Sequence, residues 1–197
     1  MGNDWKMSIE NITKEDVVLT LIKKATEYTG TENKGVHGKK ALQKSLYFLN
    51  EKFHLFGFRW ADYGPLSGEI QQIAEDLIVR GNVTVTKVPT KKDGIFTQQM
   101  EYCSKDDSYF EELGMPSELD SELNEIVKFT AGRNPRDLEL LASVHYWAIR
   151  QQDLLDEYSV DYILEKLTEL KPDAGFKQSD VEYAIETLVT HEYLPKN

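Results

Sequence analysis

The chain has 197 residues, of which 40% are hydrophobic and 29% are charged. This composition is that of a folded protein, and the length allows one large domain or two small ones. Apolar runs such as residues 17–22 are far shorter than the roughly 18 to 20 residues that a membrane span needs, and the N-terminus lacks the apolar core of a signal peptide. We therefore expect a cytoplasmic protein with no membrane segment.

The net charge of −11 is concentrated in the second half of the chain. Residues 1–103 contain 14 Lys and Arg against 13 Asp and Glu, whereas residues 104–197 contain 9 against 21. Such an acidic half repels polyphosphate, so it serves solubility or offers a face to a basic protein partner. The single cysteine, Cys103, excludes an internal disulfide and a multi-thiolate metal site, and is predicted to be a small buried side chain.

Helices are predicted first over residues 13–28 and 39–53. The second of them carries apolar side chains around well over one face, which predicts that it packs on both sides. A strand is expected at 58–62 and a third helix at 67–80. Strands at 83–88 and 95–103, joined by a turn at 89–94, then predict a hairpin with a lysine-rich tip.

The stretch from Trp60 to Gly81 is the one around which this half is organised. Pro65 fixes its own φ and pushes Gly64 out of the helical region, so the strand must end in a turn. Ser67 is then expected to cap the third helix, and Gly81 to end it in the left-handed conformation. The apolar positions of this helix form one stripe: Ile70, Ile73, Ala74, Leu77 and Ile78.

The order helix, helix, strand, helix, hairpin is that of a winged-helix domain, with the third helix lying on the first two. The second half is predicted to be helical, with a short turn at 108–113 and helices at 117–131, 136–150, 159–170 and 179–191. The expected fold is therefore α+β and mostly helical. Residues 1–103 form a winged-helix-like domain, and residues 104–197 form an acidic helical lobe packed against it.

A search for chemistry predicts no catalytic residues, no metal site and no cofactor. The chain has no G-x-S-x-G elbow, Cys103 has no catalytic flanking signature, and no two histidines stand at helical spacing. His145 lies on an apolar stripe beside Tyr146 and Trp147, which favours a hydrogen-bonded core histidine over a ligand or a base.

Residues 34–44 place four lysines, two glycines and a histidine at a helix N-terminus, where they could hold a phosphate group. The segment is not a Walker A loop, because Lys40 stands at the hydroxyl position and the preceding element is a helix. The alternative interpretation is a solvated loop that leads into a lysine-rich, exposed helix face.

A winged helix would read DNA with its third helix, but the exposed positions there include Glu69, Glu75 and Asp76 against one base, Arg80. This balance argues against insertion into a groove. If the protein binds nucleic acid, the residues expected to contact phosphates are Lys39, Lys40, Lys44, Lys91 and Lys92. A lysine-tipped hairpin is also a common way to keep a sheet edge soluble.

Three motifs resemble a known family: G-K-K-A-L-Q-K-S-L-Y-F-L at residues 38–49, Y-G-P-L-S at 63–67, and L-E-L-L-A-S-V-H-Y at 138–146. They resemble the YwgA-like proteins of bacteria and archaea. The chain is more distantly similar to the Panacea domain of SocA-like antitoxins, which has a K-L-Q-K-L-x-Y-F helix and a later Y-G-P turn. Ala41 departs from that pattern, which prefers Lys. The resemblance implies a helical, winged-helix-like module without known catalysis, whose relatives act by binding a protein.

The leading hypothesis is thus a non-catalytic, intracellular protein-interaction module, antitoxin-like or regulatory, that uses its acidic half or the turn residues Tyr63, Gly64, Pro65 and Ser67. The alternatives are a winged-helix DNA-binding transcriptional regulator and an enzyme whose site, around His145 or His37, is not visible from the sequence. The sequence indicates neither the partner nor the oligomeric state.

Overall fold

A computed structural model describes residues 12–29, 35–92, 95–104 and 115–196. The first half contains α2 (Lys14–Thr29), α3 (Gly38–Phe53), β1 (Arg59–Ala61), β2 (Gly64–Leu66), α4 (Gly68–Arg80), β3 (Val83–Lys92) and β4 (Ile95–Ser104). The second half contains α5 (Ser117–Thr130), α6 (Pro135–Leu155), α7 (Val160–Leu170), the short 3-10 helix η1 (Pro172–Ala174) and α8 (Gln178–Thr190). The predicted class, α+β and mostly helical, is confirmed.

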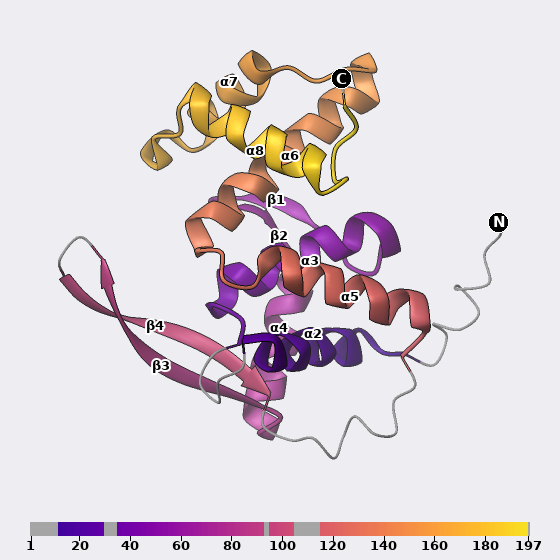
Figure 1. Ribbon diagram of the computed structural model, residues 1–197, viewed down its shortest axis with the longest axis vertical. Helices are drawn as coiled ribbons and strands as arrows, with labels where there is room; N and C mark the ends of the chain where they lie inside the picture. The colour runs from indigo at the N-terminus through magenta and orange to yellow at the C-terminus, as the bar shows by residue number, and fades with distance from the viewer. Residues whose placement is uncertain (1–11, 30–34, 93–94, 105–114, 197) are drawn as a thin grey trace.

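The helix α3 lies in the middle of the fold, as the width of its apolar surface predicts (Figure 1). It packs against α4, α5, α6, β2 and β4. Leu46 and Leu49 on α3 are fully buried, together with Leu123 on α5 and Leu141 on α6. Because all four belong to one hydrophobic cluster, the two halves of the chain share a single core.

The hairpin of β3 and β4 extends away from the helices in Figure 1. It is antiparallel, with Val83 opposite Ser104 and Lys92 opposite Ile95. The turn predicted at 89–94 was placed too early, because β3 continues through Pro89, which stands opposite Gln98. A two-stranded ribbon tolerates proline, which lacks an N–H, because each strand has a free edge. Cys103 is buried, as predicted.

The strand β2 was missed by the sequence analysis, which expected only a turn after the first strand. It pairs antiparallel with β1, with Trp60 opposite Pro65. Three-residue strands have too few positions for the alternation that reveals a longer strand. The helix α6 was also predicted too short, since it continues five residues beyond Arg150 to Leu155.

The element order of residues 14–104 is otherwise the predicted one, and α4 packs against α2, α3 and β3. The winged-helix interpretation of this order stays a prediction. The short turn predicted at 108–113 lies outside the described residues. Within the described parts of the chain, none of the helices has the length and apolar character that crossing a bilayer requires.

Candidate functional site

The turn between β1 and β2 presents Tyr63 on the surface, where it is 57% exposed. The residues that follow turn inward at once, because Gly64 and Pro65 are both buried. An exposed aromatic side chain is therefore supported by a buried backbone, which gives the turn a defined position against the helices.

Gly64 allows the turn to approach α3 and α6 closely. Its φ of +84° is in the left-handed region, which L-residues rarely adopt. A Cβ atom there would lie 2.6 Å from Oγ of Ser143, and 3.6 Å from Nζ of both Lys44 and Lys171. Glycine is favoured at this position by its conformation, and any larger residue would also force the hydroxyl of Ser143 to move.

Lys44 is a buried lysine on α3, only 1% exposed. Its ammonium group donates a hydrogen bond to the carbonyl oxygen of Pro65 at 2.6 Å, which ties α3 to the turn. Burial lowers the pKa of Lys44 to about 7, and the nearby charge of Lys171 adds to this effect. The structure thus corrects the expectation that Lys44 lies on an exposed helix face.

Glu139 on α6 joins two further lysines to this cluster. Lys40 and Lys171 each donate to one of its carboxylate oxygens, both at 2.5 Å. Burial alone would raise the pKa of Glu139, but the hydrogen bonds from Lys171 and Lys40 outweigh it, so the pKa is lowered. For a lysine, burial acts in the other direction. It lowers the pKa of Lys171, although the hydrogen bond to Glu139 and the charge of Glu139 act to raise it.

Two aromatic rings cover these lysines. The amine of Lys40 lies 4.3 Å from the ring centre of Tyr63, and that of Lys171 lies 5.5 Å from the ring centre of Trp60. Both distances are within the range of a cation–π interaction. Tyr63 is therefore held on one side by the charge of Lys40.

Ser67 is fixed by Gln43 on α3. The N–H of Ser67 donates to Oε1 of Gln43 at 2.9 Å, and Nε2 of Gln43 donates to the carbonyl oxygen of Ser67 at 2.8 Å. Ser67 does stand at the N-cap position of α4, but the prediction that its side chain caps the helix is wrong. Its buried Oγ has no hydrogen-bond partner within the described chain, and neither has Oγ of Ser143.

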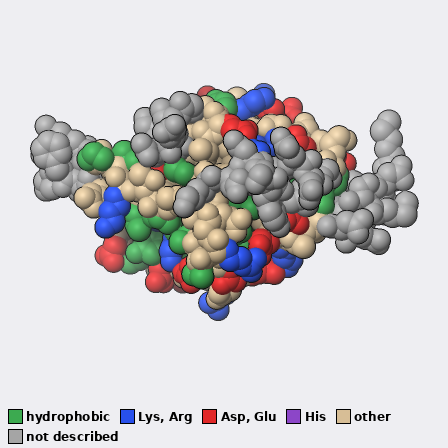
Figure 2. Space-filling view, turned by 90° about the horizontal axis from the view of Figure 1, so that it is seen from below, with side chains coloured by type: hydrophobic (Ala, Val, Ile, Leu, Met, Phe, Trp, Pro, Cys, Tyr) green, Lys and Arg blue, Asp and Glu red, His purple; other side chains and the backbone are tan. Residues whose placement is uncertain are grey.

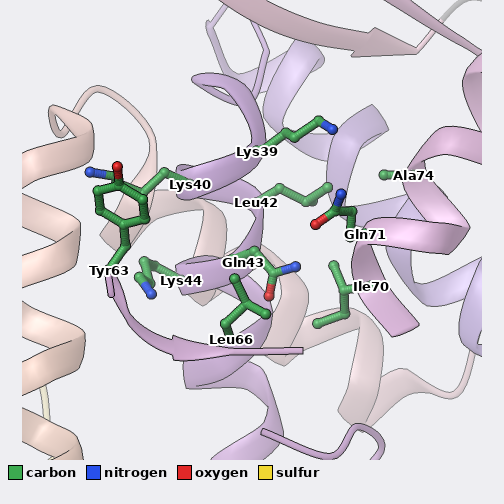
Figure 3. A pocket seen from close by; sticks show the side chains of 10 residues that line it. All are labelled: Lys39, Lys40, Leu42, Gln43, Lys44, Tyr63, Leu66, Ile70, Gln71 and Ala74. Atoms are coloured by element: carbon green, nitrogen blue, oxygen red, sulfur yellow. The ribbon is translucent and has the colours of Figure 1, made fainter. Parts of the chain in front are cut away.

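A pocket of about 330 Å³ opens beside this turn, between α3, β2 and α4 (Figure 3). In Figure 3 Lys39 and Lys40 extend from α3 in different directions, Lys40 toward Tyr63, while Gln71 and Ala74 lie on α4. The lining is mostly apolar on its inner side. The residues around the pocket are Lys39, Lys40, Leu42, Gln43, Lys44, Tyr63, Leu66, Ile70, Gln71 and Ala74.

An exposed ion pair bridges one end of the pocket. Lys39 on α3 donates to Oε1 of Glu75 on α4 at 2.8 Å, and Nε2 of Gln71 donates to the same oxygen at 3.1 Å. The hydrogen bond from Lys39 lowers the pKa of Glu75, and the reciprocal hydrogen bond raises the pKa of Lys39. Both side chains are about half exposed, so water and salt compete with this pair.

The surface around α4 carries charges of both signs. Lys14 on α2 pairs with Glu69 at 2.8 Å, and Arg80 pairs with Glu15 at 2.6 Å. On the face of the molecule seen in Figure 2, basic and acidic side chains lie next to one another along the lower edge. Of the acidic residues that argued against groove insertion of the third helix, Glu69 pairs with Lys14 and Glu75 with Lys39, whereas Asp76 accepts a hydrogen bond from Gln72.

The structure brings together most of the residues that the sequence singled out around the turn. Tyr63 lies against Lys40, and Gly64 and Pro65 lie against Lys44. Ser67 is bonded to the neighbouring Gln43, whereas Lys39 is at the far end of the pocket. Lys91 and Lys92 lie on β3 in the hairpin, and their side chains lie outside the described part of the structure.

Sequence reasoning missed Glu139, Ser143 and Lys171, which complete the buried cluster. Glu139 and Ser143 lie within the third shared motif, residues 138–146, so that motif was the available signal for them. Lys171 follows α7 in a segment that was interpreted only as the end of a helix. Nothing in its local sequence distinguishes it from an exposed lysine.

His145 is the histidine that the sequence analysis placed in the core. His145 is buried, and its ring nitrogens contact Oη of Tyr47 at 2.8 Å and the carbonyl oxygen of Tyr193 at 3.0 Å. Burial lowers its pKa to about 4, so the ring is neutral near pH 7. The prediction of a core histidine is confirmed. Over the described residues, no three or more His, Cys, Asp or Glu side chains are grouped to hold a metal ion.

A comparison with models of known protein families finds no match, and a comparison with curated proteins finds no significant match either.

Proposed function

We propose that this protein is a non-catalytic protein-interaction module whose binding surface is the Tyr63 turn together with the adjoining apolar pocket. We define this surface, the turn–pocket surface, by the exposed Tyr63 and Gln71 and the half-buried Leu66, with Ile70 and Ala74 buried beneath them. The observation that carries the proposal is a mostly apolar, 330 Å³ pocket beside a 57% exposed tyrosine. Aromatic anchors and apolar pockets at the centre of a contact are what protein interfaces use most.

The contacts beneath this surface hold the turn in one conformation, so the turn can bind a partner without changing its backbone. Lys44 and Gln43 fasten the turn to α3, and Gly64 lets it lie against α6. A surface held in one conformation loses little entropy when a partner binds. The resemblance to antitoxin-like proteins that act by binding a protein agrees with a regulatory role in the cytoplasm.

The alternative, a winged-helix DNA-binding regulator, receives less support from the lysines proposed for it. Lys44 is buried, and Lys40 is paired with Glu139, a carboxylate that is itself only 9% exposed. A lysine that already has a carboxylate partner gains less from a phosphate than a free one, because the first pair must be broken.

The test is capture of a partner from an extract of the cells that encode the protein, with two matched variants. Gln71 and Gln72 are adjacent, exposed, and each hydrogen-bonded to an acid four residues on. Only Gln71 lines the pocket. Gln71→Trp is therefore expected to cover the pocket, whereas Gln72→Trp places the same side chain elsewhere on α4.

We expect the wild-type protein and Gln72→Trp to retain a stoichiometric protein partner, and Gln71→Trp to reduce its retention at least about tenfold, as for a central contact residue. Circular dichroism of both variants checks that they are folded. The proposal fails if no partner is retained at low salt, or if Gln71→Trp and Gln72→Trp retain it equally.

A further inference from the structure

The charge on the pocket lining is of one sign. Lys39, Lys40 and Lys44 line it, and no aspartate or glutamate does so among the residues that the structure describes. The pocket therefore combines an apolar interior with lysines along its α3 side. Such a lining favours an apolar group that carries a negative charge beside it, and disfavours one that carries a positive charge.

The lysines differ in how readily they can accept a new partner. The amine of Lys40 is tied to Glu139, whose side chain is 9% exposed, and lies over the ring of Tyr63. Lys44 is buried and donates to Pro65. Lys39 is 58% exposed and is held by one surface ion pair to Glu75, which is a weak interaction. Lys39 is thus the lysine whose carboxylate partner can be exchanged.

We propose that the pocket takes a short segment of a protein partner in which a leucine-sized apolar side chain enters the pocket and a neighbouring Asp or Glu pairs with Lys39. This inference rests on the proposed function and specifies the chemistry of the partner. The apolar side chain lies against Leu66, the half-buried apolar residue of the lining, above the buried Leu42, Ile70 and Ala74. The carboxylate replaces Glu75 as the partner of Lys39.

The first experiment uses three acetylated, amidated peptides that differ in one residue: Ser-Asp-Leu-Leu-Ser, Ser-Asn-Leu-Leu-Ser and Ser-Lys-Leu-Leu-Ser. Binding to the full-length protein is measured by the shifts of the methyl NMR signals of Leu42, Leu66, Ile70 and Ala74. We expect the Asp peptide to bind most tightly and the Lys peptide least, with the difference shrinking as salt is added.

The second experiment uses another matched pair of variants. It distinguishes the contribution of Lys39 to peptide binding from the effect of the net charge on α4. Glu75→Gln and Asp76→Asn each remove one negative charge, but only Glu75 is paired with Lys39. We expect Glu75→Gln to tighten binding of the Asp peptide about threefold, because it releases Lys39 from a weak surface pair. Asp76→Asn is expected to have a smaller effect. In Lys39→Gln, the Asp and Asn peptides should bind equally.

The inference is overturned if the three peptides bind equally, if none of them shifts the pocket methyl signals at millimolar concentration, or if octanoate shifts these signals and the peptides do not. The last result would assign the pocket to a small-molecule acid. Suppose that Gln71→Trp loses the captured partner but the three peptides bind equally. This result would overturn the inference and leave the proposed function standing. If Gln71→Trp retained the partner as well as the wild-type protein does, the proposed function itself would be overturned.

Discussion

Gly64 and Gly81 have nearly the same backbone conformation, with φ of +84° and +83°, but very different surroundings. A Cβ atom at Gly81 would meet nothing within 4 Å, whereas one at Gly64 would lie 2.6 Å from Oγ of Ser143. Gly81 ends α4 in the left-handed conformation that the sequence predicts there. Gly64 additionally provides room for a buried contact between the turn and α6.

Replacing each of these glycines with alanine distinguishes the cost of the left-handed conformation from the cost of the close contact with Ser143. Gly81→Ala is expected to lower the free energy of unfolding by about 1–2 kcal/mol, the cost of a side chain in the left-handed region. Gly64→Ala adds overlap with Ser143 to the same strain and should cost about 1–3 kcal/mol more. Urea unfolding of the two variants measures the difference. Equal losses would contradict a role for Gly64 in close approach.

At the scale of elements, the largely buried cluster of Lys40, Lys44, Glu139 and Lys171 joins four parts of the chain. Lys44 connects α3 to β2 through Pro65, and Glu139 connects α6 both to α3 and to the segment after α7. The amines of Lys44 and Lys171 are buried near this one carboxylate, and that of Lys40 is partly exposed. Burial, and secondarily the repulsion from Lys171, lowers the pKa of Lys44.

The lowered pKa of Lys44 predicts how stability depends on pH. It is about 7 in the folded protein and 10.5 ordinarily, so between these values the unfolded chain binds more protons than the folded one. The free energy of unfolding should therefore rise with pH in this window, by up to about 1.4 kcal/mol per unit. Lys44→Met should show a smaller rise, because the lowered pKa of Lys171 contributes in the same direction. Urea unfolding at several pH values between about 7 and 10 measures it.

Lys52→Met is the control for this prediction, because Lys52 is a half-exposed lysine on the same helix. It should retain the pH dependence of the wild-type protein. If the wild-type protein and Lys44→Met gave parallel pH profiles, Lys44 would not titrate in this window.

At the scale of the whole molecule, the hydrophobic core crosses the boundary at residue 103. α3 from the first half packs against both α5 and α6 from the second. Phe48 on α3 lies 5.2 Å from Phe129 on α5, measured between ring centres, and 4.8 Å from Tyr193 near the C-terminus. Unfolding the second half alone would expose this surface of α3 to water.

We therefore expect the two halves to unfold together. Trp60 in β1 and Trp147 in α6, two of the three tryptophans, lie 5.2 Å apart between ring centres, so their fluorescence reports on the contact between the halves. Far-UV circular dichroism reports on all the helices. The two signals should give one coincident transition in urea, the mark of two-state unfolding. Separated transitions would show that residues 1–103 fold independently of the rest.

The sequence by itself determined the helices, the hairpin and the turn at Gly64 and Pro65, because these depend on patterns within about 20 neighbouring residues. It also identified His145 and Cys103 as buried side chains. It did not show β2, whose three residues are recognisable only when paired with β1. It placed Lys44 on an exposed face, because lysine is almost always found there.

Only the tertiary structure decided what the candidate site contains. Glu139 and Lys171 lie far along the chain from Lys44 and Gly64, and no local pattern links them. Packing brings them together, since α6 and the segment after α7 fold back onto α3 and the turn. The pocket beside Tyr63 arises in the same way, because its walls come from three elements that meet only when the core forms.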